Sequence, residues 1–171
     1  MDMTDKFDVF AFEQNYSEGK CLFKVGNNTI CMFETDKEYG KQVIPDDPAT
    51  VGTQTLYFPD TLTVSCEGQF IKEFDIQIGV WRMYDKFGDL IMEKNMDEHY
   101  PVSWEDMQKH FLENDIHLED IRRLNRALNR ENNRYVWILV LNAPSGVMDI
   151  AHFDAETGAL IKRTKTNIIK A

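Results

Sequence analysis

The chain has 171 residues, of which 43% are hydrophobic and 28% are charged, and its formal net charge is −10. This composition is typical of a globular protein rather than a disordered one, and the length fits one domain or two small lobes. No apolar run approaches the ~18 residues of a membrane-spanning helix, and the polar start Met1–Lys6 does not resemble a signal peptide, so we expect no membrane partner.

The negative charge is concentrated in the first two thirds of the chain. Residues 1–115 hold 23 acidic and 10 basic residues, a balance of −13, whereas residues 116–171 hold 6 and 9, a balance of +3. Acidic surface repels nucleic acid and attracts basic proteins, so we expect a basic protein partner and no nucleic acid. Solubility is the alternative reason for this charge.

The first predicted elements are a short lead-in and a hairpin. Residues 5–14 predict a short helix or an irregular segment. Strand-forming runs at 21–25 and 29–33 flank Gly26-Asn27-Asn28, which predicts a β-hairpin. The acidic, proline-containing segment 34–52 predicts a connecting loop, with a short strand at 41–44 as an option.

Further hairpins extend this pattern. Residues 55–58 and 62–66 predict a second hairpin around Pro59-Asp60-Thr61. Residues 70–78 alternate between apolar and polar side chains as a strand does, and residues 79–94 predict a third hairpin. Residues 20–95 therefore predict an antiparallel meander.

The pattern changes after Pro101. A capping box at Ser103–Asp106 predicts a helix ending near Asn114, and an apolar stripe predicts a second helix over 118–130. Three strands should follow, at residues 134–141, 147–153 and 159–162. The expected fold class is α+β: an antiparallel meander, then two helices and a three-stranded antiparallel meander. We expect a β-rich lobe at 1–98 and a helix–helix–meander lobe at 99–171, in one continuous globular unit.

One hairpin carries a family pattern. Gly79, Trp81, Tyr84, Gly88 and Leu90 form G-x-W-x-x-Y-x-x-x-G-x-L, which resembles the variant MORN repeat of many bacterial proteins, including antitoxin-like ones. Residues 57–66 resemble a degenerate copy. Alternation puts Trp81 on one face of its strand and Tyr84 on the other, and Gly88 suits positive φ.

Phe87 departs from the usual pattern, because such turns carry a polar residue before the glycine. The aromatic side chain either packs inward or is exposed as a contact for a partner.

The end of the chain carries a second resemblance. Asp154-Ala155-Glu156-Thr157-Gly158 precedes the last predicted strand and is similar to the end of a PepSY domain, where an aspartate and a T-G pair hold this position. The resemblance implies a PepSY-like C-terminal lobe.

Taken together with the start Lys6-Phe7-Asp8 and the Trp-Glu-Asp helix, these motifs resemble small cytoplasmic bacterial proteins often encoded beside polymorphic toxins. The resemblance implies an immunity protein that neutralises a secreted polymorphic or type VI secretion toxin by occluding its active site, and the acidic charge suits a cationic nuclease. The candidate partner contacts are Glu34, Asp36, Glu38, Asp46, Asp47, Asp85, Phe87 and Asp89.

Two other classes of function remain open. The protein could be a non-catalytic structural or peptide-binding scaffold that uses a sheet edge. It could also be a small hydrolase with two close carboxylates in an apolar pocket.

The sequence offers no motif for catalysis, a metal or a cofactor, and we expect none of the three. Histidines 99, 110, 117 and 152 lack metal-ligand spacing, and no nucleophile signature or phosphate loop is present. Cysteines 21, 31 and 66 fit buried, reduced thiols of a cytoplasmic protein.

Arginines supply one more candidate. On the predicted second helix, Arg122, Arg126 and Arg130 would line one face. They could contact an anion or nucleic acid, or be solvated or paired internally, and the nearby Glu119 favours the second explanation.

Overall fold

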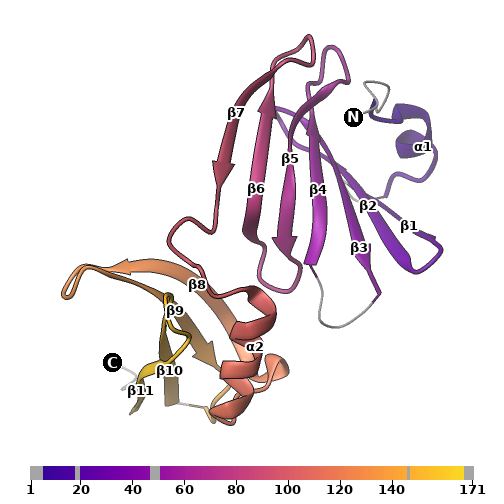
Figure 1. Ribbon diagram of the computed structural model, residues 1–171. Coiled ribbons are helices and arrows are strands. Elements are labelled where there is room, and N and C mark those ends of the chain that lie inside the picture. Colours follow the sequence, from indigo (N-terminus) through magenta and orange to yellow (C-terminus); the bar gives the residue numbers. More distant parts are fainter. Residues whose placement is uncertain (1–5, 18–19, 47–50, 146, 168–171) are drawn as a thin grey trace. The chain divides into compact units, whose positions relative to one another are not determined.

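The computed structural model describes residues 6–17, 20–46, 51–145 and 147–167 (Figure 1). The chain divides into two compact units, Met1–Met96 and Asp97–Ala171. Each unit contains an α-helix and an antiparallel sheet, so the described chain is mostly antiparallel β.

The sheet of the first unit is a seven-stranded meander in which each strand pairs with the next one in sequence. Its strands are β1 (Lys20–Val25), β2 (Asn28–Glu34), β3 (Tyr39–Pro45), β4 (Val51–Tyr57), β5 (Val64–Ile71), β6 (Ile76–Tyr84) and β7 (Leu90–Asn95). The three predicted hairpins are confirmed. The predicted single strand over 70–78 is wrong, because residues 72–75 form a turn between β5 and β6. Much of segment 34–52, however, is strand rather than loop, because β3 fills the gap between β2 and β4.

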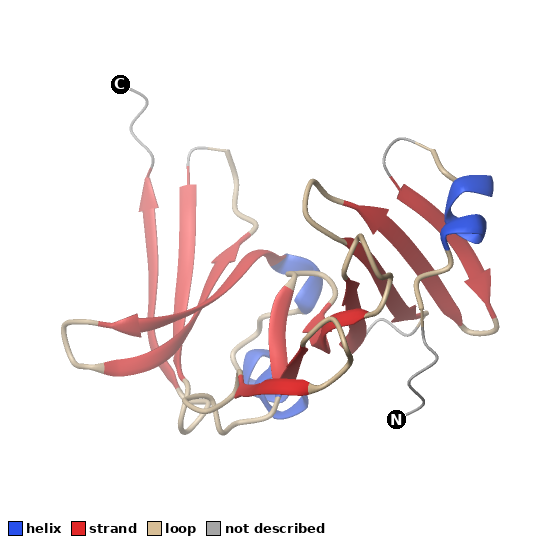
Figure 2. Ribbon diagram, turned by 90° about the horizontal axis from the view of Figure 1, so that it is seen from above, coloured by secondary structure: helices blue, strands red, loops and turns tan. Residues whose placement is uncertain are grey.

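Helix α1 (Val9–Gln14) covers one face of this sheet over its first strands (Figure 2). Asp8 caps the helix by accepting a hydrogen bond from the Ala11 amide at 2.9 Å. Phe7 and Phe12 flank the helix start and are buried in the core cluster, which also contains Cys21, Ile30, Met32 and Tyr57. The opposite face of the sheet is called the open face here.

Aromatic rings lie over glycines of neighbouring strands at three places in this sheet. The pairs are Phe33 on Gly40, Phe70 on Gly52 and Trp81 on Gly68. A Cβ atom on the glycine would lie 2.1, 2.8 or 2.3 Å, respectively, from the nearest ring atom. The glycines therefore leave room for rings that shield the exposed backbone, and each pair holds two adjacent strands together.

The MORN-like pattern of β6 and β7 has a physical reason at most of its positions. The Trp81 indole donates to the Gln69 carbonyl at 3.0 Å, and the Tyr84 hydroxyl donates to Glu67 at 2.7 Å. The pKa of Tyr84 is raised to about 12, chiefly by burial and to a lesser extent by this contact with Glu67. Gly88 has a φ of 92°, which confirms the predicted left-handed backbone.

The second unit places one helix against a four-stranded sheet. Helix α2 (Trp104–Glu113) is capped by Ser103, whose hydroxyl accepts a hydrogen bond from the Asp106 amide, as the capping box predicts. The strands are β8 (Ile121–Asn129), β9 (Arg134–Leu141), β10 (Val147–Asp154) and β11 (Leu160–Asn167), in the order β11-β10-β9-β8. Ring contacts join the helix to the sheet. The ring centres of Trp104 and Trp137 are 5.9 Å apart, and those of Phe111 and Phe153 are 4.9 Å apart.

The prediction of a second helix over 118–130 is wrong. A short 3₁₀ turn, Leu118–Asp120, leads directly into β8, so the three-stranded meander expected here is a four-stranded sheet. The reason is a β-bulge at Arg122: Ile121 pairs with Leu141, and Arg123 pairs with the preceding residue, Val140. The extra residue puts Ile121 and Leu124 on the same face, at a spacing that is otherwise typical of a helix.

Candidate functional site

An apolar row crosses the open face of the seven-stranded sheet. Phe33 of β2 pairs with Gly40 of β3, and Gly40 pairs in turn with Leu56 of β4. The pairing continues from Leu56 to Cys66 of β5, then to Met83 of β6 and Met92 of β7. Directly paired residues share a face of a sheet, so these side chains form one line across the strands. The apolar row is defined here as Phe33, Leu56, Cys66, Met83 and Met92.

The side chains of the apolar row are accessible. The first four are half-buried, and Met92 on the edge strand is 50% exposed. Burial raises the pKa of the Cys66 thiol, and the negative charges of Glu38 and Glu67 raise it further, so the thiol is protonated at neutral pH. The row is therefore a neutral, apolar surface next to carboxylates.

Most of the predicted partner contacts gather at one end of the sheet. Because strand direction alternates in a meander, the β2–β3, β4–β5 and β6–β7 connections lie at the same end. A hydrogen bond of 3.4 Å from the Thr63 hydroxyl to the Lys86 carbonyl joins two of these connections. This end, called the acidic end, carries Glu34, Asp36, Glu38, Asp85, Phe87 and Asp89.

The acids of the β2–β3 connection differ in their surroundings. Asp36 is exposed at the turn, and Glu38 lies close enough to Cys66 to affect its pKa. Glu34, in contrast, accepts a hydrogen bond from Tyr39, whose ring stacks on Phe7 at 4.7 Å. Glu34 therefore borders the helix-covered face, whereas Glu38 borders the apolar row.

The β6–β7 turn exposes its aromatic residue. Phe87 is 75% exposed, and the Lys86 ammonium lies 5.4 Å from the centre of its ring. The Asp85 carboxylate accepts hydrogen bonds from the amides of Phe87 and Asp89, at 2.8 and 3.0 Å. Asp85 thus holds the turn together, while Phe87 and Asp89 are presented to solvent.

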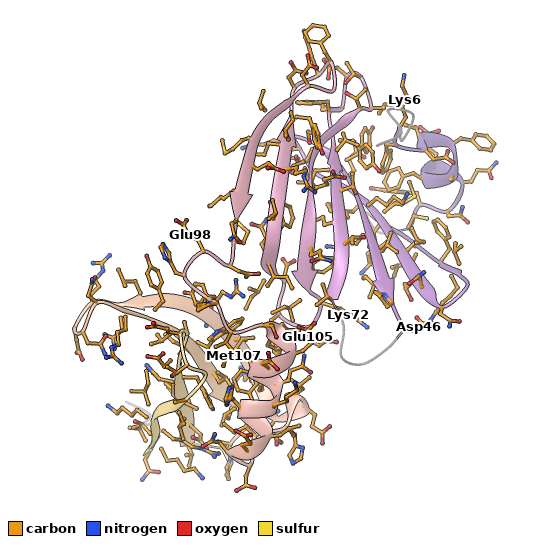
Figure 3. All side chains as sticks on the ribbon, viewed as in Figure 1. Lys6, Asp46, Lys72, Glu98, Glu105 and Met107 are labelled. Atoms are coloured by element: carbon orange, nitrogen blue, oxygen red, sulfur yellow. The ribbon has the colours of Figure 1, made fainter. Side chains whose placement is uncertain are left out.

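Asp46 is separate from this group. It lies at the opposite end of the same sheet, near Lys72 (Figure 3), and its carboxylate pairs with Lys24 at 2.6 Å. The hydrogen bond from Lys24 lowers the pKa of Asp46 below its usual range. The remaining predicted contact, Asp47, lies outside the described residues.

The arginines do not form the predicted helical face. Arg126 is largely buried in the second unit, where its guanidinium lies 4.5 Å from the Tyr100 ring centre and 4.2 Å from that of Trp137. It also pairs with Asp97 at 2.7 Å. Arg122 belongs to the bulge of β8 and Arg130 to the following turn, so the three side chains have different surroundings.

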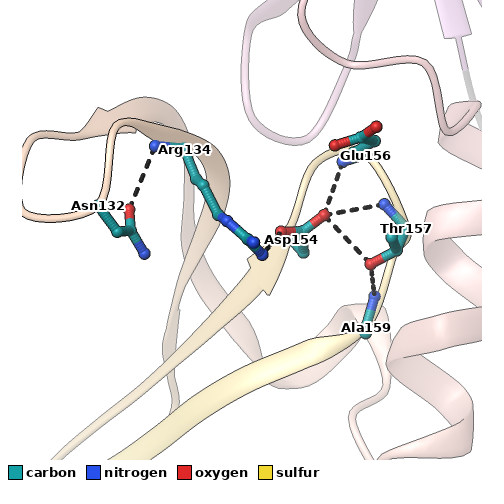
Figure 4. A network of polar contacts seen from close by, with 6 residues as sticks. All are labelled: Asn132, Arg134, Asp154, Glu156, Thr157 and Ala159. Atoms are coloured by element: carbon teal, nitrogen blue, oxygen red, sulfur yellow. Dashed lines mark hydrogen bonds and ion pairs between the residues drawn. The ribbon is translucent and has the colours of Figure 1, made fainter.

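The PepSY-like segment forms a tight turn after β10 (Figure 4). Asp154 is buried, and its Oδ1 accepts hydrogen bonds from the amides of Glu156 and Thr157 and from the Thr157 hydroxyl. Arg134 contacts Oδ2 at 3.4 Å. A cavity of about 320 Å³ beside the turn is also lined by His99, which stacks on Tyr135. Both carboxylate oxygens of Asp154 therefore have partners, Oδ1 within the turn and Oδ2 at Arg134.

The described residues contain no cluster of three or more histidine, cysteine or acidic side chains that could hold a metal ion. Over the same part of the chain, no helix combines the length and the apolar character needed to cross a membrane.

Sequence pattern alone does not predict the apolar row. Its members are spread over 60 positions and come together only through strand register, which the sequence does not specify. The one available signal was the recurrence of apolar residues near the same end of successive predicted strands. In comparisons with known proteins, no family model, curated protein or solved structure matches the chain.

Proposed function

We propose that the protein is a cytoplasmic immunity protein, which binds a secreted bacterial toxin of the polymorphic or type VI secretion kind and occludes its active site. The observation that carries this proposal is that the apolar row lies next to the carboxylates of the acidic end. A surface that combines half-buried apolar side chains with a rim of carboxylates suits a basic protein, such as a cationic nuclease.

The acidic end supplies the contacts in this proposal. Phe87 is the anchor, because a large aromatic side chain exposed at a turn can enter a pocket of the partner. Glu38 and Asp89 attract the basic partner and set its orientation. Asp85 contributes by holding the turn, and Asp46 lies too far along the sheet to take part.

Co-expression with the product of the neighbouring gene tests the proposal. We expect a complex that survives purification and restores growth to cells that make the toxin. Absence of both the complex and growth rescue contradicts the proposal.

A matched pair of charge reversals locates the contact. Asp89→Lys should weaken toxin binding about tenfold or more, since it reverses a charge in the interface. Asp46→Lys makes the same change at the other end of the sheet and should leave affinity within about twofold. Equal losses in the two variants would exclude the acidic end as the contact.

The edge strand β7 favours a second candidate, a non-catalytic scaffold that binds a peptide or a subunit. All six residues of β7 are exposed, including Leu90, Ile91 and Met92, and no described strand pairs with its outer edge. An open edge can accept an added strand. Self-association measured by light scattering, in a protein without a neighbouring toxin gene, would favour this candidate.

A further inference from the structure

The sheet of the second unit has an outer face that no described helix of that unit covers. Helix α2 packs on the inner face, against Trp137 and Phe153. Residues one position away along the strands face the other side, so Ile138, Val140 and Ile150 are on the outer face. They are half-buried and adjacent, because Val140 pairs with Ile150 and Ile138 is two positions from Val140.

Cations border these apolar side chains. Arg123 pairs directly with Val140. His152 pairs with Ile138 on one side and with Lys162 on the other, so Lys162 lies in the same cross-strand row as Ile138. The bulge of β8 brings Arg122 to this face as well, since Arg122, Val140 and Met148 line one cavity of about 130 Å³. The residues of the outer face that carry the argument are Arg122, Arg123, Ile138, Val140, Ile150 and Lys162.

The positive charge of the outer face is not neutralised by its neighbours. Arg122, Arg123 and Lys162 are exposed and take part in no ion pair with a described residue. Among the described strand residues on this face the one acid is Asp154, whose carboxylate is used within its own turn. In a protein with a net charge of −10, this is a local surface of opposite sign.

We infer that the outer face docks an acidic amphipathic helix of a partner protein. The apolar side chains of the outer face would pack against the apolar side of the partner helix, as the inner face packs against α2. The three cations would pair with carboxylates along the sides of the partner helix. Nucleic acid fits less well, because the described strand residues of this face include no phenylalanine, tyrosine or tryptophan for base stacking. An anionic membrane or a long nucleic acid extends beyond these three cations, so the net charge of −10 repels it more strongly than it repels a short acidic helix.

The outer face belongs to the second unit and the acidic end to the first, and the two would take partners of opposite charge, so docking of an acidic helix does not depend on the proposed function. The test uses the full chain and a fluorescent peptide of about 15 residues with leucine on one face and glutamate on the other, long enough to cross four strands. We expect saturable binding by fluorescence anisotropy, and binding should weaken as salt is added.

Variants of the full chain show whether the outer face is responsible. Replacing Arg122 and Arg123 together by glutamate should weaken binding about tenfold or more, whereas Arg130→Glu, outside the face, should leave it within about twofold. Lys162→Glu should weaken binding too, and it serves as an independent variant if the double substitution impairs folding, which circular dichroism would reveal.

Control ligands test the chemistry of the partner. A lysine version of the peptide and a scrambled version without the apolar stripe should bind much more weakly. Equal binding of either control, or an equal loss in the Arg130 variant, overturns the inference. So does tighter binding of single-stranded DNA or of phosphatidylserine vesicles than of the acidic peptide.

Discussion

Arg126 is charged although most of its side chain is buried. Burial lowers the pKa of Arg126, while the carboxylate of Asp97 at 2.7 Å favours the charged form. The rings of Tyr100 and Trp137 lie within cation–π distance of the guanidinium. The residue thus links the segment before α2 to the middle of the sheet in the second unit.

Replacing Arg126 should destabilise this unit. We expect Arg126→Ala to lower the free energy of unfolding by about 2 kcal/mol, since Asp97 loses its partner and two rings lose a packed neighbour. Arg126→Lys should recover only part of this loss, because an ammonium lacks the planar surface. Urea unfolding followed by tryptophan fluorescence measures both, and Arg123→Ala, an exposed neighbour, should show almost no change.

Asp149 makes the stability of the second unit depend on pH. Arg163 donates two hydrogen bonds to its carboxylate, at 3.1 and 3.0 Å, and these hold the pKa of Asp149 below its usual range. The folded-state pKa is therefore lower than the unfolded one. The ionised group stabilises the fold above about pH 4, and this stabilisation is lost as the pH falls through the folded pKa.

Removing the carboxylate should remove this pH dependence. Asp149→Asn is expected to lower stability at pH 7 by about 1–2 kcal/mol and to flatten the decline in stability below about pH 4. Unfolding midpoints at a series of pH values test this. A variant that declines as steeply as the wild type would assign the acid sensitivity to other groups.

Pairs of an aromatic ring and a glycine stabilise the first sheet. A methyl group at Gly68 would come within 2.3–2.5 Å of the Trp81 indole. We expect Gly68→Ala to destabilise the protein by about 1–3 kcal/mol, because the buried ring must move. In the background of Trp81→Val the same change should cost little, and the double-mutant cycle gives the coupling between the two residues.

The β6–β7 turn allows folding and binding to be separated. Asp85→Ala removes the acceptor for two amides and should lower stability by about 0.5–2 kcal/mol, as loss of a cap does. Asp89→Ala removes a similar charge but no such acceptor and should leave the unfolding midpoint unchanged. If both variants unfold alike, the Asp85 carboxylate does not hold the turn.

Local sequence patterns predict much of the fold, and the prediction fails where one extra residue forms a bulge in a strand. The hairpins around Gly26 and Gly88 and the helix capped by Ser103 follow from turn and cap residues close in sequence. The bulge at Arg122 gave β8 the apolar spacing of a helix, so strand and helix could not be told apart there. The apolar row required register across six strands, which no local pattern contains.

Each of the two units has a core of its own. The core cluster of the first unit lies within residues 7–57, and the ring contacts around Trp104, Trp137 and Phe153 lie within the second. We therefore expect the fragment 97–171 to fold alone, with cooperative thermal unfolding and a near-ultraviolet circular dichroism signal. Loss of that signal in the fragment would show that its core needs the rest of the chain.

The meander order of β1 to β7 has a consequence for how the first unit forms. Each strand contacts mainly the strand beside it in sequence, so the loops that must close are short and the contact order is low. Assembly can then spread from one hairpin to the next, as in repeat proteins. In such a chain a hairpin can be gained or lost at an edge during evolution, so the length of the apolar row can change while the remaining strands keep their register.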